Sequence, residues 1–408
     1  MTLRRLLLAL LALLVLLIAD GASAARLEIF EGKNADLIAS TSRGIRLRFK
    51  EPNMVFRIGG RAHGDLAFND SPLNEDPTGK LRRGRVYLSG RLFDDFGFKI
   101  ERDFAPAKAE FRNLWASYQL SNRVGLKAGN FVAPFGLEQV ASSNYLTFME
   151  RSMSGSIAPS FQSGLLLSTN GKLTGMRTRH RWTWALSVGA EPLGQQSDDL
   201  HRSEHWSVVT RATWAPIARR NRVIHFGGAA EYRDVLGDDN YRIGTQVESS
   251  QGPRLVDTGN IANVDSVASA GAEAAAMFGP VLIQGEYQHA FVQRSTGGDA
   301  DFGGGYVQAS WVVTGEHRDY SRQMGVFNGL TPSRDWGAVE LATRYSVMDL
   351  NDGGVNGGEA QNWTVGANWY LRSNLRLMFN YVRVNAKNQP AGTPDDPQIF
   401  QARAALFF

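Results

Sequence analysis

Cysteine is absent from the 408 residues, so no disulfide can form within the chain. Long apolar runs are scarce, and the most prominent one, Leu6 to Ile18, is shorter than the roughly 20 residues of a membrane-spanning helix. Neither sign of charge dominates, because the formal net charge is only +4. These absences exclude a disulfide scaffold and a helical membrane domain, and nothing in the charge indicates a nucleic-acid partner.

The N-terminus has the pattern of an export signal. Arg4 and Arg5 precede the apolar run, and Ala22-Ser23-Ala24 supplies the small-x-small sequence at which such signals are cleaved. We therefore predict a signal peptide over residues 1–24. Its removal takes away two arginines and one aspartate and lowers the net charge from +4 to +3.

The alternation of apolar and polar residues from Met54 to Phe68 is typical of a long strand with one apolar and one polar face. The same period continues over 82–92 and 96–103, on either side of Asp94-Asp95, which predicts a hairpin. The alternation from Met54 to Phe68 is longer than most strands of soluble proteins.

Counting every segment of this kind gives sixteen predicted strands. They are 54–68, 82–92, 96–103, 111–120, 124–132, 161–171, 180–190, 204–215, 222–233, 266–278, 281–292, 304–314, 336–348, 362–371, 375–384 and 398–408. Short turns alternate with long polar connections at 69–80, 191–203, 234–264, 293–303, 349–361 and 385–397, as in outer-membrane barrels. The fold class is all-β, a transmembrane antiparallel barrel over 54–408, preceded by a periplasmic-side segment over 25–53. The long connection 315–335 violates the alternation.

The last predicted strand carries a second signal. Phe400, Ala402, Ala404, Leu406 and Phe408 share one face, and an apolar terminal face ending in Phe is typical of outer-membrane barrels. A sheet of these strands in a membrane has to close into a barrel, since lipid offers no hydrogen bonds to an unpaired strand edge.

Residues 123–151 combine a strand, 124–132, with a long apolar connection. That connection contains the corner Pro134-Phe135-Gly136 and the pair Ser142-Ser143, and it is too apolar for a disordered linker. We predict that it folds into the barrel as the third loop and narrows it.

Motifs of catalysis are lacking. No GxSxG, HExxH or CxxC pattern occurs, so we expect no enzymatic activity, no cofactor and no metal.

Basic residues share the polar face of the early strands. They include Arg57, Arg61, Arg83, Arg85, Arg91, Lys99, Arg123 and Lys127, against Asp65, Glu101 and Asp103. A cationic wall favours anions over cations in a pore, although some of these charges would pair with carboxylates in any porin.

Several segments resemble the phosphate-selective porin O and P family across nearly the whole chain after residue 24. They are Arg82-Arg83, KAGNFVAPFGLE at 127–138, SSNYLTFMER at 142–151, RLVDTGNI at 254–261, SWVVTGEHRDY at 310–320 and NWYLRSNLRLMFNYVRV at 368–384. The resemblance implies a homotrimer of sixteen-stranded barrels with an inward third loop, in which basic residues guide anions such as phosphate.

Residues carried over from the family include Arg82-Arg83 and Ser142-Ser143, but the chain departs from the pattern nearby. Asn144 stands where the phosphate-selective members have a lysine, and Arg85 stands where an aromatic residue is common. The family's arginine-rich strand and loop is reduced to Arg242 and Arg254. The predicted pore-lining and anion-binding residues are Arg57, Arg61, Arg82, Arg83, Arg85, Arg91, Lys99, Lys127, Ser142, Ser143 and Arg242.

The predicted function is passive diffusion of small anions, phosphate among them, across the bacterial outer membrane. One alternative is a general porin for sugars or dicarboxylates, since Trp115, Trp182 and Trp184 could form an aromatic slide. The other is an adhesin that acts through its long surface loops. The expected partners are small anions, outer-membrane lipid and two further copies of the chain.

Overall fold

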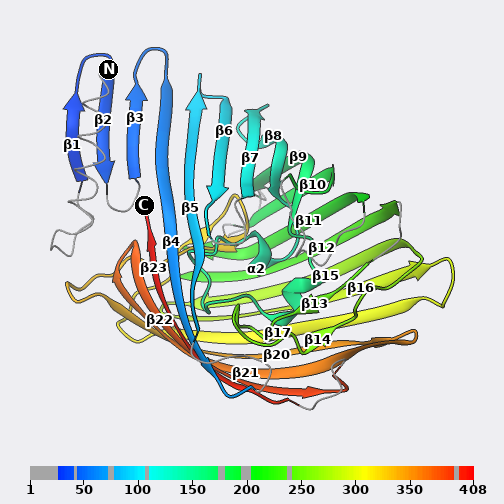
Figure 1. The fold of residues 1–408 in the computed structure, drawn as a ribbon. Helices are drawn as coiled ribbons and strands as arrows, with labels where there is room; N and C mark the ends of the chain where they lie inside the picture. Colours follow the sequence, from blue (N-terminus) through cyan, green and yellow to red (C-terminus); the bar gives the residue numbers. More distant parts are fainter. Residues whose placement is uncertain are drawn as a thin grey trace.

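The computed structural model describes residues 26–40, 44–71, 78–105, 110–172, 180–193, 204–236, 241–389 and 395–408. Within this part of the chain sixteen antiparallel strands form one closed barrel, in which each strand pairs with the next and β23 pairs with β4 (Figure 1). The prediction of a sixteen-stranded antiparallel barrel is confirmed. The predicted signal peptide, 1–24, lies outside the described residues.

The barrel strands match the predicted segments closely. They are β4 (Met54–Asn69), β5 (Thr78–Leu92), β6 (Phe96–Asp103), β7 (Glu110–Gln119), β8 (Val124–Val132), β9 (Phe161–Lys172), β10 (Arg181–Ala190), β11 (Glu204–Arg219), β12 (Arg222–Leu236), β15 (Val264–Phe278), β16 (Val281–Arg294), β17 (Ala300–Val312), β20 (Ala338–Asp352), β21 (Val355–Arg372), β22 (Leu375–Lys387) and β23 (Gln398–Phe407).

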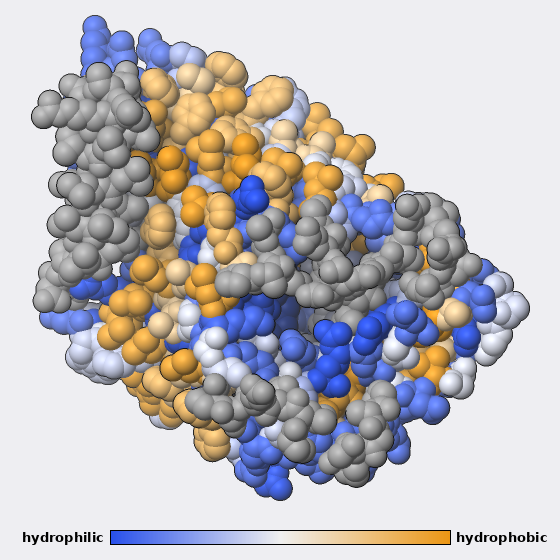
Figure 2. Space-filling model, viewed as in Figure 1, coloured by the Kyte–Doolittle hydropathy of each residue, from blue (hydrophilic) through white to orange (hydrophobic). Residues whose placement is uncertain are grey.

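Large apolar side chains cover the outer face of these strands, whereas most of their buried polar side chains point inward. On β23, Phe400 is 58% exposed, whereas its neighbour Gln401 and the nearby Arg403 are buried. On β21, Trp363 is 57% exposed beside the buried Asn362. Figure 2 shows hydrophobic side chains gathered over the outer face of the barrel. A closed barrel with this polarity satisfies every strand edge and presents an apolar surface to lipid.

One predicted loop is wrong. Residues 349–361 are not a long connection, because β20 runs to Asp352 and β21 begins at Val355. Gly353 and Gly354 form the turn between them, with φ of 56° and 78°. The Gly-, Asn- and Asp-rich composition that indicated a loop belongs to a tight hairpin, in which two glycines adopt the left-handed conformation at little steric cost.

Two other connections contain short hairpins of their own. β13 (Gly244–Thr245) pairs with β14 (Val256–Asp257) in the connection between β12 and β15. β18 (Tyr320–Ser321) pairs with β19 (Val326–Phe327) in the connection between β17 and β20.

The connection between β8 and β9 carries one turn of α-helix, α2 (Leu137–Val140), and one 3₁₀ turn, η1 (Met153–Ser156). No helix in the described part of the chain has the length and apolar character needed to span a membrane.

Residues 25–53 contain three strands that the alternation analysis did not predict: β1 (Arg26–Glu31), β2 (Ala35–Ser40) and β3 (Gly44–Phe49). They extend the sheet from the first part of β4, where Ile45 pairs with Ile58, while β23 pairs with the later part of β4 (Figure 1). Ile45 and Leu37 form a small apolar cluster against which Phe408 packs. The location of this segment on the periplasmic side stays a prediction.

Candidate functional site

A cavity of about 1060 Å³ lies between strands β4 to β11 and parts of the three long connections described above. Among the described residues that line it, eleven are arginine or lysine and five are aspartate or glutamate. The lining therefore carries a positive excess. Low-dielectric walls around one sign of charge focus the electrostatic potential along the passage.

A β-bulge on β5 places two consecutive arginines on the cavity side. His63 of β4 pairs with Arg83, but Gly64 pairs with Leu81, so Arg82 is an extra residue in the ladder. Leu81 is 42% exposed, and Arg82 and Arg83 both line the cavity. Strict alternation would direct only one of two adjacent residues inward, and a bulge removes that restriction.

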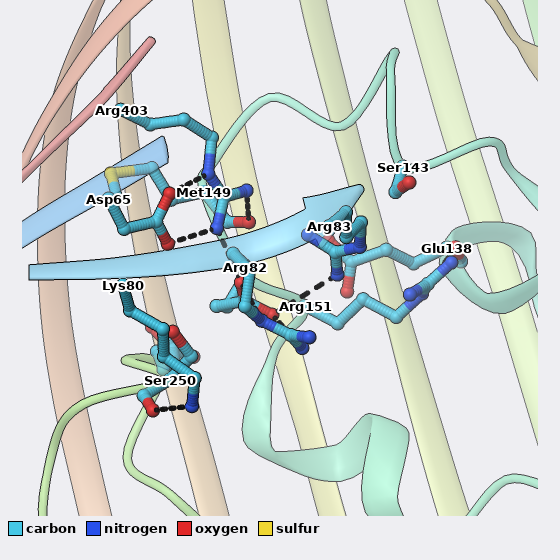
Figure 3. A network of polar contacts seen from close by, with 12 residues as sticks. Asp65, Lys80, Arg82, Arg83, Glu138, Ser143, Met149, Arg151, Ser250 and Arg403 are labelled. Carbon is cyan, nitrogen blue, oxygen red and sulfur yellow. Dashed lines mark hydrogen bonds and ion pairs between the residues drawn. The ribbon is translucent and has the colours of Figure 1, made fainter. Parts of the chain in front are cut away.

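Arg82 and Arg83 share one carboxylate, that of Glu150 in the connection between β8 and β9. Arg82 donates two hydrogen bonds of 3.0 Å to Glu150, and Arg83 lies 3.5 Å from it. Arg403 of β23 lies 2.6 Å from Glu150 and also donates two hydrogen bonds of 2.6 Å to Asp65 (Figure 3). The pKa of the Glu150 carboxyl lies well below its usual range, because the three guanidinium groups outweigh the burial that would raise it.

Arg61 joins this connection to the strand wall. Its guanidinium donates to Ser143 Oγ at 2.9 Å and to Ser142 Oγ at 3.5 Å. The same side chain lies 3.5 Å from Glu101 on β6. The two serines and one of the predicted arginines are thus brought together.

Residues 133–160 contact strands on several sides of the barrel. Glu286 of β16 accepts the backbone N–H groups of Leu137 and Glu138 at 2.8 and 2.7 Å, at the start of α2. On β22, Arg376 donates to the carbonyl of Leu146 at 2.8 Å. Glu138 itself lies 3.4 Å from Arg344 of β20, and burial raises the pKa of its carboxyl above the usual range.

Lys127 and Arg151 differ from the other cations of the cavity. Among the described residues neither has an ion pair with a carboxylate. The Lys127 ammonium lies over the rings of Trp115 and Phe131, at 4.6 and 5.9 Å from their centroids. Arg151 donates to three backbone carbonyls, those of Glu138, Gln139 and Ala141, at 3.0 to 3.3 Å. Aromatic rings thus hold Lys127 and backbone carbonyls hold Arg151, although the carboxylates of Glu138 and Glu150 also attract Arg151 electrostatically.

The connection 313–337, which breaks the alternation of short and long connections, packs against the wall. Arg318 is 3% exposed and lies 2.7 Å from Glu340 of β20. Arg211 of β11 donates to the carbonyls of Met324 and Gly325 at 2.8 and 2.9 Å. The segment is long because it reaches these partners on the wall. Its length could not be explained from the sequence alone.

The connection between β12 and β15, expected to be a polar surface loop, contributes residues from its described part, 241–263, to the largest apolar cluster of the described residues. Tyr241, Ile243, Val247 and Leu255 pack against inward-facing side chains of β15 to β23. Glu248 is buried beside them and lies 2.8 Å from Arg344. Sequence reasoning missed this packing, although the apolar residues in the segment were a usable signal.

Most of the predicted site residues meet at the cavity, and three do not. Those that line it are Arg61, Arg82, Arg83, Arg85, Lys99, Lys127, Ser142 and Ser143. Arg57 is not among its lining residues; Arg91 lines a separate space of about 200 Å³ together with Arg46 and Arg48. Arg242 donates two hydrogen bonds, of 2.7 and 2.6 Å, to Asp257. Their role in anion binding stays a prediction.

Several cations of the lining were missing from the predicted set: Lys80, Arg112, Arg151, Arg211 and Arg254. Arg112 faces the cavity because of a second bulge, and Arg211 lies on β11, beyond the early strands whose basic residues formed the prediction. Of the tryptophans considered for an aromatic slide, Trp115 and Trp184 are lining residues and Trp182 is not.

No group of three or more His, Asp or Glu side chains that could hold a metal ion occurs within the described ranges.

The family model described as "Phosphate-selective porin O and P" matches residues 56–408. The chain belongs to this family. Porin O of Pseudomonas aeruginosa is 25% identical over 404 residues, covering 89% of this chain and 90% of the relative. A protein of Caulobacter vibrioides is also 25% identical, over 82% of this chain and 69% of its own length.

Solved structures share the fold. A loop-deletion mutant of OmpT from Vibrio cholerae aligns with a TM-score of 0.55 at 12% identity, over 87% of this chain and 99% of its own. An anion-selective porin from Comamonas acidovorans aligns with a TM-score of 0.54 at 14% identity, over 87% of this chain and 100% of its own. With the family, the barrel architecture identifies the chain as a porin of the bacterial outer membrane.

Proposed function

We propose that this porin is a passive diffusion pathway for small anions, with phosphate among its solutes. The observation that carries the proposal is the pair Lys127 and Arg151, two cavity-lining cations without a carboxylate partner among the described residues. An anion that reaches Lys127 meets a charge with no carboxylate partner in the described part of the chain, and at Arg151 it meets a guanidinium that no carboxylate there binds directly. The family description and the anion selectivity named for the Comamonas porin support this assignment.

The solute would exchange part of its water for donors on the wall. The Arg61 guanidinium lies within hydrogen-bond reach of the hydroxyl groups of Ser142 and Ser143, so an oxyanion at this point can accept from all three. The planar guanidinium group can donate two hydrogen bonds at once to two oxygens of a phosphate or a carboxylate. Binding has to remain weak enough for release, as in any conducting pore.

Residues 133–160 act, in this proposal, as the constriction. Their bonds to Glu286, Arg376 and the cluster around Glu150 support an inward position. They would fix Ser142 and Ser143 against Arg61 on the pathway.

The pore is proposed to discriminate only weakly between phosphate and other small anions. Asn144 contributes no charge where the phosphate-selective members carry a lysine, and the charge of Arg85 is offset by Asp103 at 2.7 Å. Dicarboxylates of similar size are therefore expected to compete with phosphate.

Assembly into a homotrimer is part of the proposal, as the family resemblance implies. One of the solved OmpT structures is described as a trimer form. We also propose that the chain has no enzymatic activity, as expected for a member of a channel family.

The test is block of chloride current by phosphate in planar bilayers. Addition of millimolar phosphate should reduce the current of the natural protein. The double variant Lys127→Gln, Arg151→Gln should need roughly tenfold more phosphate for the same block, which corresponds to about 1.4 kcal/mol of lost interaction. Arg123→Gln serves as a matched control, because Arg123 is exposed at the turn after β7 and does not line the cavity. No block of the natural protein would reject the phosphate site.

A further inference from the structure

Glu101 of β6 is a carboxylate in the middle of the cationic lining. Its side chain is 1% exposed, and four donors converge on it. Lys99 lies at 2.7 Å, Arg61 at 3.5 Å, Arg85 at 3.6 Å and Asn113 at 3.0 Å. Three of the four donors are cations that line the cavity.

A bulge on β7 brings the fourth donor to Glu101. Ile100 of β6 pairs with Leu114, but Arg102 pairs with Phe111, so Arg112 and Asn113 together stand opposite Glu101. Both residues line the cavity as a result. The local fold therefore gives this carboxylate an additional neutral donor.

The register of the neighbouring strands shows why a carboxylate is needed here. Arg61 of β4 pairs directly with Arg85 of β5, and like charges in that position repel each other. Asp103 accepts a hydrogen bond from Arg85 at 2.7 Å and one from the backbone N–H of Gly84 at 3.0 Å, and among the described residues it forms no ion pair with Arg61. Glu101 is the group that bridges both arginines.

We propose that Glu101 is an internal counter-anion that occupies the donors a permeating anion uses and thereby sets the affinity of the site. The proposal rests on the anion pathway proposed above and adds to it a residue that weakens binding. With Glu101 present, Arg61 and Lys99 already have an anionic partner, and the solute has to share them. The solute is consequently released more readily, and Arg61 stays directed at Ser143.

The carboxylate acts most strongly on solutes with more charge. Chloride offers one charge and no fixed geometry, whereas hydrogen phosphate offers two charges and several acceptor oxygens. Hydrogen phosphate can therefore take donors from Glu101, but the charge of Glu101 repels it more strongly than it repels chloride. Glu101 is thus a positioning residue whose charge weakens phosphate binding more than chloride binding.

The test uses the Glu101→Gln variant of the full chain, which keeps the shape and the bond to Asn113 but removes the charge. The phosphate concentration that halves the chloride current should fall by about tenfold, and each blocking event should last longer. Glu101→Asp, which keeps the charge, should restore block close to that of the natural protein.

The matched comparison is Glu110→Gln. Glu110 lines the same cavity and is buried, but among the described residues it forms an ion pair with a single arginine, Arg112, at 3.0 Å. A general loss of negative charge would tighten block equally in both variants, and equal shifts would overturn the positioning role of Glu101. A shift of less than threefold for Glu110→Gln is expected.

Asn113→Asp gives a test in the opposite direction and remains available where Glu101→Gln fails to assemble. A second carboxylate beside Glu101 should weaken phosphate block by several fold. Unchanged or weaker block in Glu101→Gln, with clear block of the natural protein, would overturn this inference alone. Absence of block in the natural protein would instead overturn the proposed function.

Discussion

Arg82 donates two parallel hydrogen bonds of 3.0 Å to Glu150, which makes one of the most prominent arginines of the sequence an anchor of the connection between β8 and β9. Arg83 and Arg403 complete the same cluster. Paired guanidinium and carboxylate groups of this geometry are specific as well as strong. The arginine pair that marks the family therefore supports the proposed constriction, and its charge is only partly offset because three guanidinium groups share Glu150.

Removing the shared carboxylate should loosen this connection. Glu150→Gln leaves three guanidinium groups without their anionic partner, and breaking a buried ion pair from one side typically costs about 3–5 kcal/mol. We expect a lower temperature of barrel unfolding on semi-native gels and a single-channel current with more frequent fluctuations. Glu359→Gln, on the outer side of β21, is the control, and equal behaviour of the two variants would contradict the anchor.

The anchor should also survive acidification. Because the pKa of Glu150 is depressed in the folded protein, its stabilising contribution is complete above the ordinary glutamate pKa of about 4.3 and is lost only as the pH falls through the depressed value. The single-channel chloride current of the natural protein should keep its amplitude and low noise from neutral pH to about pH 4. A transition to a noisy current centred on the ordinary glutamate pKa would contradict this expectation.

The connection 313–337 is expected to restrict the pore from the other side. Arg318→Ala removes the partner of Glu340 and a donor to the carbonyl of Tyr145, so the segment should detach from the wall. The predicted result is a larger and more variable single-channel conductance, together with a loss of about 3–5 kcal/mol in stability.

Arg334→Ala provides the comparison for that change. Arg334 lies 3.8 Å from Glu316 with 44% of its side chain exposed, and exposed pairs contribute only about 0–1 kcal/mol. Its conductance should match that of the natural protein. A conductance of Arg318→Ala that also matches would show that the segment does not restrict the pathway.

The barrel was predictable because one physical rule governs most of it. Lipid outside and water inside impose a two-residue period on every strand, and that period reveals the sixteen strands and the inward parity of Arg61, Arg85 and Lys99. The hairpin at 353–354 was misread as part of a loop, since glycine-rich composition indicates turns without giving their length.

The site was less predictable because it depends on departures from that rule. Bulges at Arg82 and at Arg112 break the period, and no alternation analysis can place their side chains. Arg82 entered the prediction only through family resemblance, and Arg112 did not enter it. The pairing of Glu150 and Glu101 with arginines joins positions far apart in the chain, so it required the three-dimensional arrangement.

A further expectation concerns the unneutralised lysine. Lys127→Gln should reduce chloride conductance at low ionic strength more than at 1 M salt, because a single charge is screened within about 3 Å at that concentration. Arg57→Gln should have a smaller effect, since Arg57 is not a lining residue of the cavity. Equal and salt-independent reductions in both variants would contradict a local electrostatic role for Lys127.

The most direct test of the central claim is the reversal potential of the natural protein across a bilayer with a tenfold gradient of potassium chloride. A pathway whose lining carries eleven cations against five carboxylates should be selective for chloride over potassium, so the reversal potential should have the sign set by chloride. A reversal potential near zero, or one with the sign set by potassium, would contradict an anion pore.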